Sequence, residues 1–557
     1  MATAIAHPRS RTISIERVTP SYLVVAVAAF AVGLSLSARL DYAPIWDGYE
    51  YATAIHNAAT GPFSPDELRF AGHASQAYAL PLAIAQRLVV GQYWPILLVN
   101  TVLLVVAGIG FHRLTRLVLP DETYDIDRAL ITGAFVLQPA LLAAVVQPGL
   151  DLPLVPGFLW ATVFVLEGRP IWAALAGLAL VFSKETGVLL YAALGAAYVL
   201  RAPRATLGFD GNRAEALKRL AILVVPGVVF GLYVAYRSFV ARGEPAVWNA
   251  GTAMIGQSLL RQLLVPRIDR YLLTYIAIML VLNFAWVMSL ASVAAGVMAF
   301  RRASARGSVG REVREWLRTT PGFVVLLAAI TAFALTRFAT YANARYLLGF
   351  VGLLLAIGLV AFVSLPLPTL ARRAILTAFA VLVGVSVERT IDPVSRGVFG
   401  TFPVGKHDLL RLTSITRECC ALGRDQLAYN LEFTNVAAVT DFALETMRIG
   451  DSTMIVVPDS TNWRAIPRIN PFTSRRAPSP IGGVEPLVTE ADSAALFIGQ
   501  RRAAVFVALP NGSAERGLKL LSRSFTIGPE RRVVEGGYAV SVYRLNPRQV
   551  PLPSWAP

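Results

Sequence analysis

Apolar runs long enough to cross a bilayer recur along most of this 557-residue chain, and they constrain its fold more than any other feature. The hydrocarbon core of a membrane is about 30 Å thick, so a helical crossing needs about 20 apolar residues. Hydrophobic residues make up 55% of the chain and charged residues only 15%. The sequence therefore predicts a polytopic α-helical membrane protein.

Eleven segments are candidates for spans by length and apolar character. They are Ser21–Leu40, Trp94–Phe111, Ala129–Gln147, Leu152–Leu166, Ile171–Ser183, Thr186–Leu200, Ala221–Val240, Tyr271–Phe300, Gly322–Phe338, Tyr346–Ser364 and Ala374–Val387. A twelfth apolar segment, Gln76–Val90, is short and is followed by Gly91 and Gln92. We expect it to be a re-entrant helix, a helix lying in the interface, or the upper part of a broken helix.

The net charge of +16 is a topology signal rather than a sign of nucleic-acid binding. Lys and Arg gather in three short connectors, within residues 201–219, 301–318 and 372–373. Basic connectors stay on the cytoplasmic side and attract anionic membrane lipids. We therefore expect an integral membrane protein with a cytoplasmic N-terminus, whose first apolar run is a retained span rather than a signal peptide.

Residues 1–390 form the predicted transmembrane module, and residues 391–557 form a predicted extracytoplasmic α/β domain. In this second part the apolar runs shorten to strand length, with Pro, Gly and Ser between them. The expected strands are Met454–Val457, Ala494–Phe497, Ala503–Leu509 and Tyr538–Tyr543, after helical patterns near Asp408–Cys420 and Gln426–Met447. Cys419 and Cys420 are adjacent and have no metal-ligand spacing, so no metal site is predicted.

An acidic and aromatic cluster follows the first span: Trp46, Asp47, Tyr49, Glu50 and Tyr51. A carboxylate at the membrane face can act as a general base on an acceptor hydroxyl, orient it, or help hold a divalent cation. The aromatic residues would form an amphipathic wall for a sugar or a lipid headgroup. The alternative for Asp47 is a solvated loop acid or the cap of an interfacial helix beginning near Tyr49, which the neighbouring aromatic residues make less favoured. Glu50 could equally be a capping-box partner of Asp47.

Asp151 lies in a turn between two spans, on the same predicted face as Asp47. Pro148, Gly149 and Pro153 interrupt regular helix around it. An N-cap for the following helix is the alternative interpretation. Two carboxylates from separate loops on one membrane face are more informative than either alone.

Cationic residues are predicted on this same face. Arg337 and Arg345 flank a short loop, and guanidinium groups match phosphate oxygens. Lys184 interrupts two apolar segments beside Glu185, with which it could form an internal ion pair. His73 is a candidate contact to a phosphate or to an acceptor. Snorkelling at the interface is the alternative for the arginines, and a plain loop histidine for His73.

The chain has no Walker A loop and no dinucleotide glycine fingerprint. An outward-facing site has no access to cytosolic nucleotide sugars. If a sugar is transferred there, its donor must be carried across the membrane on a lipid.

The chain resembles the C superfamily of integral-membrane glycosyltransferases. The branch in question contains bacterial relatives of dolichyl-phosphate-mannose protein mannosyltransferases and of the aminoarabinose lipid A transferase. The resemblance rests on four loose motifs within the first 365 or so residues, at residues 46–52, 149–153, 183–187 and 343–348. It implies a bacterial inner or plasma membrane protein that transfers a sugar, with inversion, from a polyprenyl-phosphate donor at the outer face to an acceptor that is a protein, a lipid or a polysaccharide.

Within this resemblance Asp47 matches the first-loop acid, Asp151 the second-loop acid, and Arg345 a donor-phosphate contact. Gly48 follows Asp47 where many relatives have a second acid, which leaves a metal requirement open. No other cofactor is expected. Two further classes are a transporter or lipid flippase, which would carry ionisable groups at mid-membrane in symmetric halves, and a non-catalytic surface assembly protein.

Overall fold

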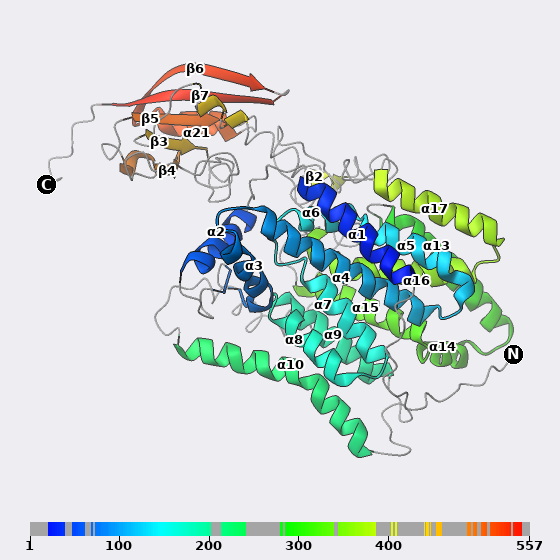
Figure 1. Ribbon diagram of the computed structural model, residues 1–557. Helices are drawn as coiled ribbons and strands as arrows, with labels where there is room; N and C mark the ends of the chain where they lie inside the picture. The colour runs from blue at the N-terminus through cyan, green and yellow to red at the C-terminus, as the bar shows by residue number, and fades with distance from the viewer. Residues whose placement is uncertain are drawn as a thin grey trace.

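The protein is seen here as a computed structural model. It describes residues 20–38, 47–61, 68–70, 73–201, 213–240, 279–281, 284–338, 344–385, 403–404, 407–408, 439–440, 442–444, 446, 453–458, 487–491, 494–497, 503–508, 513–535 and 538–548. Most of these residues are helical, and a small sheet follows near the C-terminus (Figure 1).

The described helical part is built from α-helices, several of which are joined by short turns. They are α1 (Pro20–Ala38), α2 (Asp47–Thr60), α3 (Gln76–Leu88), α4 (Trp94–Val118), α5 (Asp125–Val136), α6 (Pro139–Val145), α7 (Leu154–Leu166), α8 (Pro170–Val181), α9 (Thr186–Arg201), α10 (Arg213–Val240), α13 (Ala285–Ala305), α14 (Val309–Leu317), α15 (Thr320–Phe338), α16 (Leu348–Ser364) and α17 (Thr369–Val385). Two 3₁₀ turns, η1 (Glu122–Tyr124) and η2 (Ala344–Leu347), precede α5 and α16.

Three helices in the described part are long and apolar enough to cross a membrane: α4, Arg219–Arg237 of α10, and Arg345–Ser364. The number rises to five if two bent pairs each count as one span, α5 with α6 at 54° and α14 with α15 at 87°. Shorter apolar helices include α7 with 13 residues and α8 with 12. The expectation of eleven spans stays a prediction.

Close helix packing in the core depends on small residues. A Cβ added at Gly110 of α4 would lie 2.9 Å from Nε1 of Trp160 on α7. That indole also donates a hydrogen bond to the backbone oxygen of Val106, at 3.0 Å. A Cβ at Gly358 of α16 would lie 2.5 Å from Sδ of Met288 on α13. Glycine at these positions lets helices approach closely, as is common between membrane helices.

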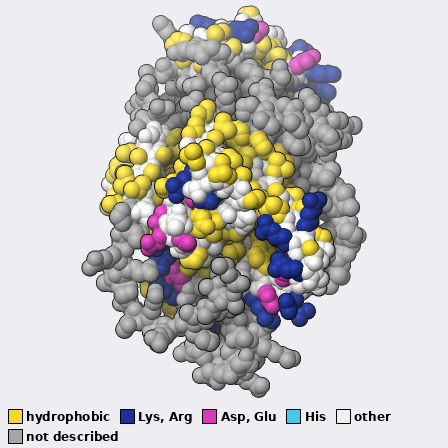
Figure 2. Space-filling view, turned by 90° about the vertical axis from the view of Figure 1, so that its right-hand side faces the viewer, with side chains coloured by type: hydrophobic (Ala, Val, Ile, Leu, Met, Phe, Trp, Pro, Cys, Tyr) yellow, Lys and Arg dark blue, Asp and Glu magenta, His cyan; other side chains and the backbone are white. Residues whose placement is uncertain are grey.

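The loops between these helices gather at two opposite ends of the helical part. Asp151 precedes α7 at one end, whereas Glu167 follows α7 at the other and pairs with Arg113 near the end of α4, at 2.6 Å. In the same way α16 begins beside Arg345, and the connector after it leads to Arg372 at the opposite end. Charged side chains gather around an apolar area on the face shown in Figure 2.

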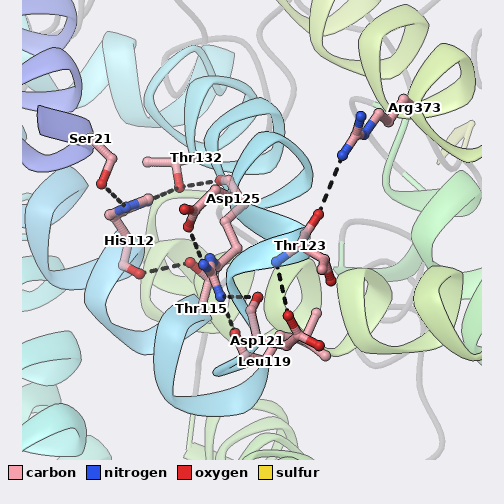
Figure 3. A network of polar contacts seen from close by, with 10 residues as sticks. Ser21, His112, Thr115, Leu119, Asp121, Thr123, Asp125, Thr132 and Arg373 are labelled. Atoms are coloured by element: carbon pink, nitrogen blue, oxygen red, sulfur yellow. Dashed lines mark hydrogen bonds and ion pairs between the residues drawn. The ribbon is translucent and has the colours of Figure 1, made fainter. Parts of the chain in front are cut away.

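The end that carries Glu167 is held by a partly buried polar network (Figure 3). Arg128 is fully buried and donates to the backbone oxygens of Leu119 and Asp121 and to the carboxylate of Asp125. His112 lies 3.3 Å from the hydroxyls of both Ser21 and Thr132, which links α4 to α1 and α5. These contacts fix the relative positions of three helices.

A buried ion pair ties α17 to α5 at this same end. Arg372 makes two hydrogen bonds of 3.1 Å to the two carboxylate oxygens of Asp127, which is fully buried. Bidentate geometry of this kind is the strongest form of such a pair.

Helix α3 corresponds to the short apolar segment that fitted no span. It is a 13-residue helix with Pro81 inside it, and it packs on α2, α4 and α8. Its length is well below that of a full crossing. Its buried face is that of Tyr78, Ala79, Leu82, Ala83 and Gln86.

The C-terminal part contains a five-stranded mixed sheet in the order β4-β3-β5-β7-β6. Its strands are β3 (Thr453–Val457), β4 (Leu487–Glu490), β5 (Ala503–Ala508), β6 (Phe525–Glu535) and β7 (Tyr538–Pro547). Strand β3 runs parallel to β4 and β5, whereas β7 pairs antiparallel with β5 and β6. The helix α21 (Ser513–Leu521) packs on β5, with Gly517 against the ring of Phe506.

Three predicted strands are confirmed as β3, β5 and β7, but the fourth was wrong. Ala494–Phe497 forms a 3₁₀ turn, η6, because four apolar residues fit a buried turn as well as a strand. Asp408, expected to begin a helix, belongs instead to the two-residue strand β2 (His407–Asp408), which pairs with β1 (Pro403–Val404). The rest of that expected helix lies outside the described residues, as does the boundary at residue 391.

Candidate functional site

The turn between α6 and α7 carries Asp151 and is held by side chains from two other helices. The amide of Asn100 on α4 donates to the backbone oxygens of Val145 and Gln147, at 2.9 and 2.8 Å. The hydroxyl of Tyr93 donates to the oxygen of Val146, at 3.0 Å. These donors satisfy carbonyls that the end of α6 leaves without helical partners.

Tyr78 of α3 completes this support, because its hydroxyl donates to Oδ1 of Asn100 at 2.7 Å. Sequence reasoning missed Tyr78, Tyr93 and Asn100. Of these three residues only Asn100 could have been noticed in the sequence, because it is a polar side chain within the apolar run of α4. The alternative interpretation of Asp151 as a helix N-cap was wrong, since Pro153 holds that position in α7.

Asp151 lies between two cations. Nζ of Lys184 is 2.6 Å from Oδ1 of Asp151, and Nε of Arg345 is 3.3 Å from Oδ2. The three side chains are largely buried, with exposed fractions of 4% for Asp151, 10% for Lys184 and 17% for Arg345. Buried charges are tolerated only when they are paired, and here one carboxylate serves two cations.

The ring of Tyr346 lies beside both cations. Its centroid is 4.5 Å from Nζ of Lys184 and 5.3 Å from Cζ of Arg345. The negative face of an aromatic ring attracts cations at such distances. The ring therefore helps to hold two like charges together in a buried place.

Lys184 is presented by a tight turn between α8 and α9. A Cβ added at Gly187 would lie 2.1 Å from the backbone oxygen of Leu180, so only glycine fits there. The backbone N–H of Ala77 at the start of α3 donates to the oxygen of Phe182, at 3.0 Å. The turn is thus fixed both by its own packing and by α3.

Glu185 points to a different partner from its neighbour Lys184, so the internal ion pair considered for these two residues is not formed. Nδ1 of His73 lies 2.8 Å from Oε2 of Glu185, and the N–H of Ala74 donates to Oε1 at 3.2 Å. Burial alone would raise the pKa of the Glu185 carboxyl. The hydrogen bond and charge of His73, together with backbone N–H groups, outweigh this and hold that pKa below its ordinary value.

His73 also contacts Tyr51, one of the residues of the predicted aromatic wall. The buried ring of Tyr51 lies edge-on to His73, with centroids 6.4 Å apart, and is stacked on Phe70 at 5.7 Å. Tyr51 belongs to α2, which begins at Asp47.

The structure thus forms two groups of predicted site residues, one on each neighbour of a single turn. Asp151, Lys184 and Arg345, which we call the Lys184 cluster, contact one another, and Glu185 contacts His73. The backbone of Asp47, Tyr49 and Glu50 is described as the first turn of α2, and that of Arg337 as part of α15. Their side chains, and all of Trp46, lie outside the described residues. Their predicted roles stay predictions.

Metal binding was left open by the sequence. Among the described residues no group of three or more His, Cys, Asp or Glu side chains could hold one metal ion. Positive charge in the Lys184 cluster comes instead from Lys184 and Arg345.

No protein-family model and no curated protein sequence matches the chain. Among solved structures it is similar to the arabinofuranosyltransferase AftD from mycobacteria, with a TM-score of 0.44 and 14% sequence identity. The match covers 94% of this chain and spans 40% of the length of AftD.

Proposed function

We propose that this protein transfers a sugar from a polyprenyl-phosphate donor to an acceptor at the extracytoplasmic face of a bacterial inner or plasma membrane. The observation that carries the proposal is the pair of buried cations, Lys184 and Arg345, that share the single carboxylate of Asp151. The two cations lie on either side of one carboxylate, and cationic groups placed in this way suit a bound anion. At the end of an apolar helical part, the fitting anion is a phosphate attached to a lipid.

In this proposal Lys184 and Arg345 bind the donor phosphate, and Arg337 and His73 contribute to its binding. Asp151 sets the distance between the two cations. Electrostatic stabilisation of a departing phosphate is a large part of such catalysis. Because Lys184 and Arg345 supply that charge, we expect transfer to need no cofactor and to survive chelation of divalent ions.

Asp47 is the proposed general base, with Glu50 as a second acid beside it, and Trp46, Tyr49 and Tyr51 form the wall against which the sugar lies. Asp47 takes the proton of the acceptor hydroxyl while its oxygen attacks the anomeric carbon from the side opposite the phosphate. The bond from this carbon to the phosphate oxygen breaks, and polyprenyl phosphate leaves. A single displacement of this kind inverts the anomeric configuration.

The proposed orientation places the N-terminus in the cytoplasm and the C-terminal sheet outside. The Lys184 cluster then lies at the outer end of the helical part, where a lipid-carried donor arrives after crossing the membrane. The acceptor is a protein, a lipid or a polysaccharide of the cell envelope.

Transfer from radiolabelled polyprenyl-phosphate sugars by the purified protein in liposomes tests this function. The wild type is expected to release polyprenyl phosphate and to label an acceptor in a membrane extract. Asp47→Asn is expected to abolish transfer and to retain the thermal unfolding midpoint. Full activity of Asp47→Asn would rule out this residue as the base.

A further inference from the structure

The contacts of His73 give this residue a more specific task than binding. Among the described residues, Glu185 is the only side chain that hydrogen bonds to the His73 ring, through Nδ1 at 2.8 Å. A carboxylate at neutral pH only accepts hydrogen bonds, so Nδ1 carries a proton. The second ring nitrogen, Nε2, is left for another partner, and about a third of the side chain is exposed.

The position of the pair relates it to the phosphate-binding cations. Glu185 and Lys184 are consecutive residues of the turn that Gly187 and Ala77 hold in place. Lys184 reaches Asp151 from this turn, whereas Glu185 reaches His73. One rigid turn therefore fixes both a phosphate-binding cation and an imidazole, and carboxylate–imidazole pairs of this kind orient the ring for proton transfer.

We propose that His73 is the general acid of the transfer reaction and that Glu185 is its positioning residue. This inference rests on the proposed function. As the bond between the anomeric carbon and the phosphate oxygen breaks, its electron pair passes to that oxygen. The Nε2 proton of the imidazolium moves to the departing phosphate, which leaves as a monoanion, and His73 becomes neutral.

The proton that His73 gives up is balanced by the proton that Asp47 takes from the acceptor. Asp47 holds the proton of the acceptor hydroxyl, and after products leave it gives that proton to water, while His73 takes one up. The second pKa of a phosphate monoester is about 6, so the departing phosphate can accept a proton from a general acid near neutral pH.

Chemical rescue tests this role. His73→Gly is expected to lower kcat about 100-fold, the range typical of a lost general acid. Added imidazole is expected to raise the kcat of His73→Gly at least about 10-fold. Relative to His73→Gly without imidazole at the same pH, the rescue is expected to be larger at pH 6 than at pH 8, because the imidazolium form donates the proton.

His73→Gln is the matched control, since its amide can still donate to Glu185 but cannot transfer a proton and leaves no room for imidazole. It is expected to fold, to lose a similar amount of kcat, and to show no rescue. Thermal unfolding midpoints verify that both variants are folded.

Three outcomes would overturn the assignment while leaving the proposed function intact: an unchanged kcat in His73→Gln, no rescue of a folded His73→Gly, or a rescue that is larger at pH 8. The last would make His73 a base. A wild type that releases no polyprenyl phosphate from any donor would instead overturn the proposed function, and this inference with it.

Discussion

Nζ of Lys184 lies 2.6 Å from Oδ1 of Asp151, although the two residues come from different turns, 33 positions apart in the sequence. Both side chains are buried, and Arg345 approaches the other carboxylate oxygen. A buried pair of this kind destabilises the fold when one partner is removed, because the other charge is left without compensation.

Asp151→Asn is therefore expected to lower the free energy of unfolding by about 3–5 kcal/mol. The double variant Asp151→Asn with Lys184→Met is expected to recover part of this loss, since the stranded ammonium is gone. Thermal denaturation in detergent measures both. Glu315→Gln is the control, because Glu315 and Arg311 form an exposed pair at 3.9 Å that is worth at most about 0.5 kcal/mol. Equal effects of Asp151→Asn and Glu315→Gln would contradict the buried pairing.

Gly187 is expected to accept no larger residue. In Gly187→Ala the new methyl group would lie 2.1 Å from the Leu180 oxygen, so the turn that presents Lys184 must shift. We expect a loss of stability of about 1–3 kcal/mol and weaker phosphate binding. Gly195→Ala, on the same helix α9, meets nothing within 4 Å and is expected to be neutral or stabilising by up to about 1 kcal/mol. The thermal unfolding midpoints of Gly187→Ala and Gly195→Ala measure this difference. Similar midpoints for the two variants would contradict the close packing at Gly187.

The pair of Glu185 and His73 predicts a definite pH dependence. The folded-state pKa of Glu185 lies below its ordinary value, so its stabilising effect is present above about pH 4.3, the ordinary pKa of a glutamate. This effect is lost as the pH falls through the folded-state pKa. Glu185→Gln should therefore be less stable than the wild type by about 1–3 kcal/mol at pH 7, with a difference that shrinks below about pH 4. If the difference in stability between the wild type and Glu185→Gln grew as the pH fell, the pKa of Glu185 would be raised rather than lowered by folding, which would contradict the prediction.

Removal of the ion pair at the far end of the helical part is expected to lower the stability of the protein without weakening its binding of polyprenyl phosphate. Asp127 and Arg372 join α5 to α17 by two hydrogen bonds of 3.1 Å. Asp127→Asn is expected to destabilise the protein by about 3–5 kcal/mol. Below its unfolding temperature it should bind polyprenyl phosphate as the wild type does. Weaker binding in the folded variant would mean that the Lys184 cluster is not the phosphate site.

Much of the Lys184 cluster could be anticipated from the chain. Alternation of spans places Asp151, Lys184 and Arg345 at one face, and the structure brings these three side chains into contact. What could not be predicted is the pairing. Lys184 and Glu185 are neighbours in sequence, yet they diverge to Asp151 and His73 because the turn at residues 182–185 is held by α3 rather than by the pair itself.

The role of α3 could not be predicted from the sequence either. A hydropathy pattern shows its length and apolar character but not its neighbours, and Tyr78 reads simply as one more aromatic residue in an apolar run. Only tertiary structure shows that its hydroxyl bonds to Asn100, which in turn holds the turn of Asp151. In the C-terminal part, β4 and β6 were missed because β4 is only four residues long and residues 528–532, which are Gly, Pro and three charged residues, interrupt the apolar residues of β6.

Binding of sugar-free polyprenyl phosphate to the protein in nanodiscs of neutral lipid tests the central claim most directly, since it requires no knowledge of the sugar. We predict that Lys184→Met and Arg345→Met each raise the Kd at least about 10-fold, equivalent to about 1.4 kcal/mol for a charge-assisted contact. Asp127→Asn should leave it unchanged. Wild-type affinity in both folded cation variants would contradict the account.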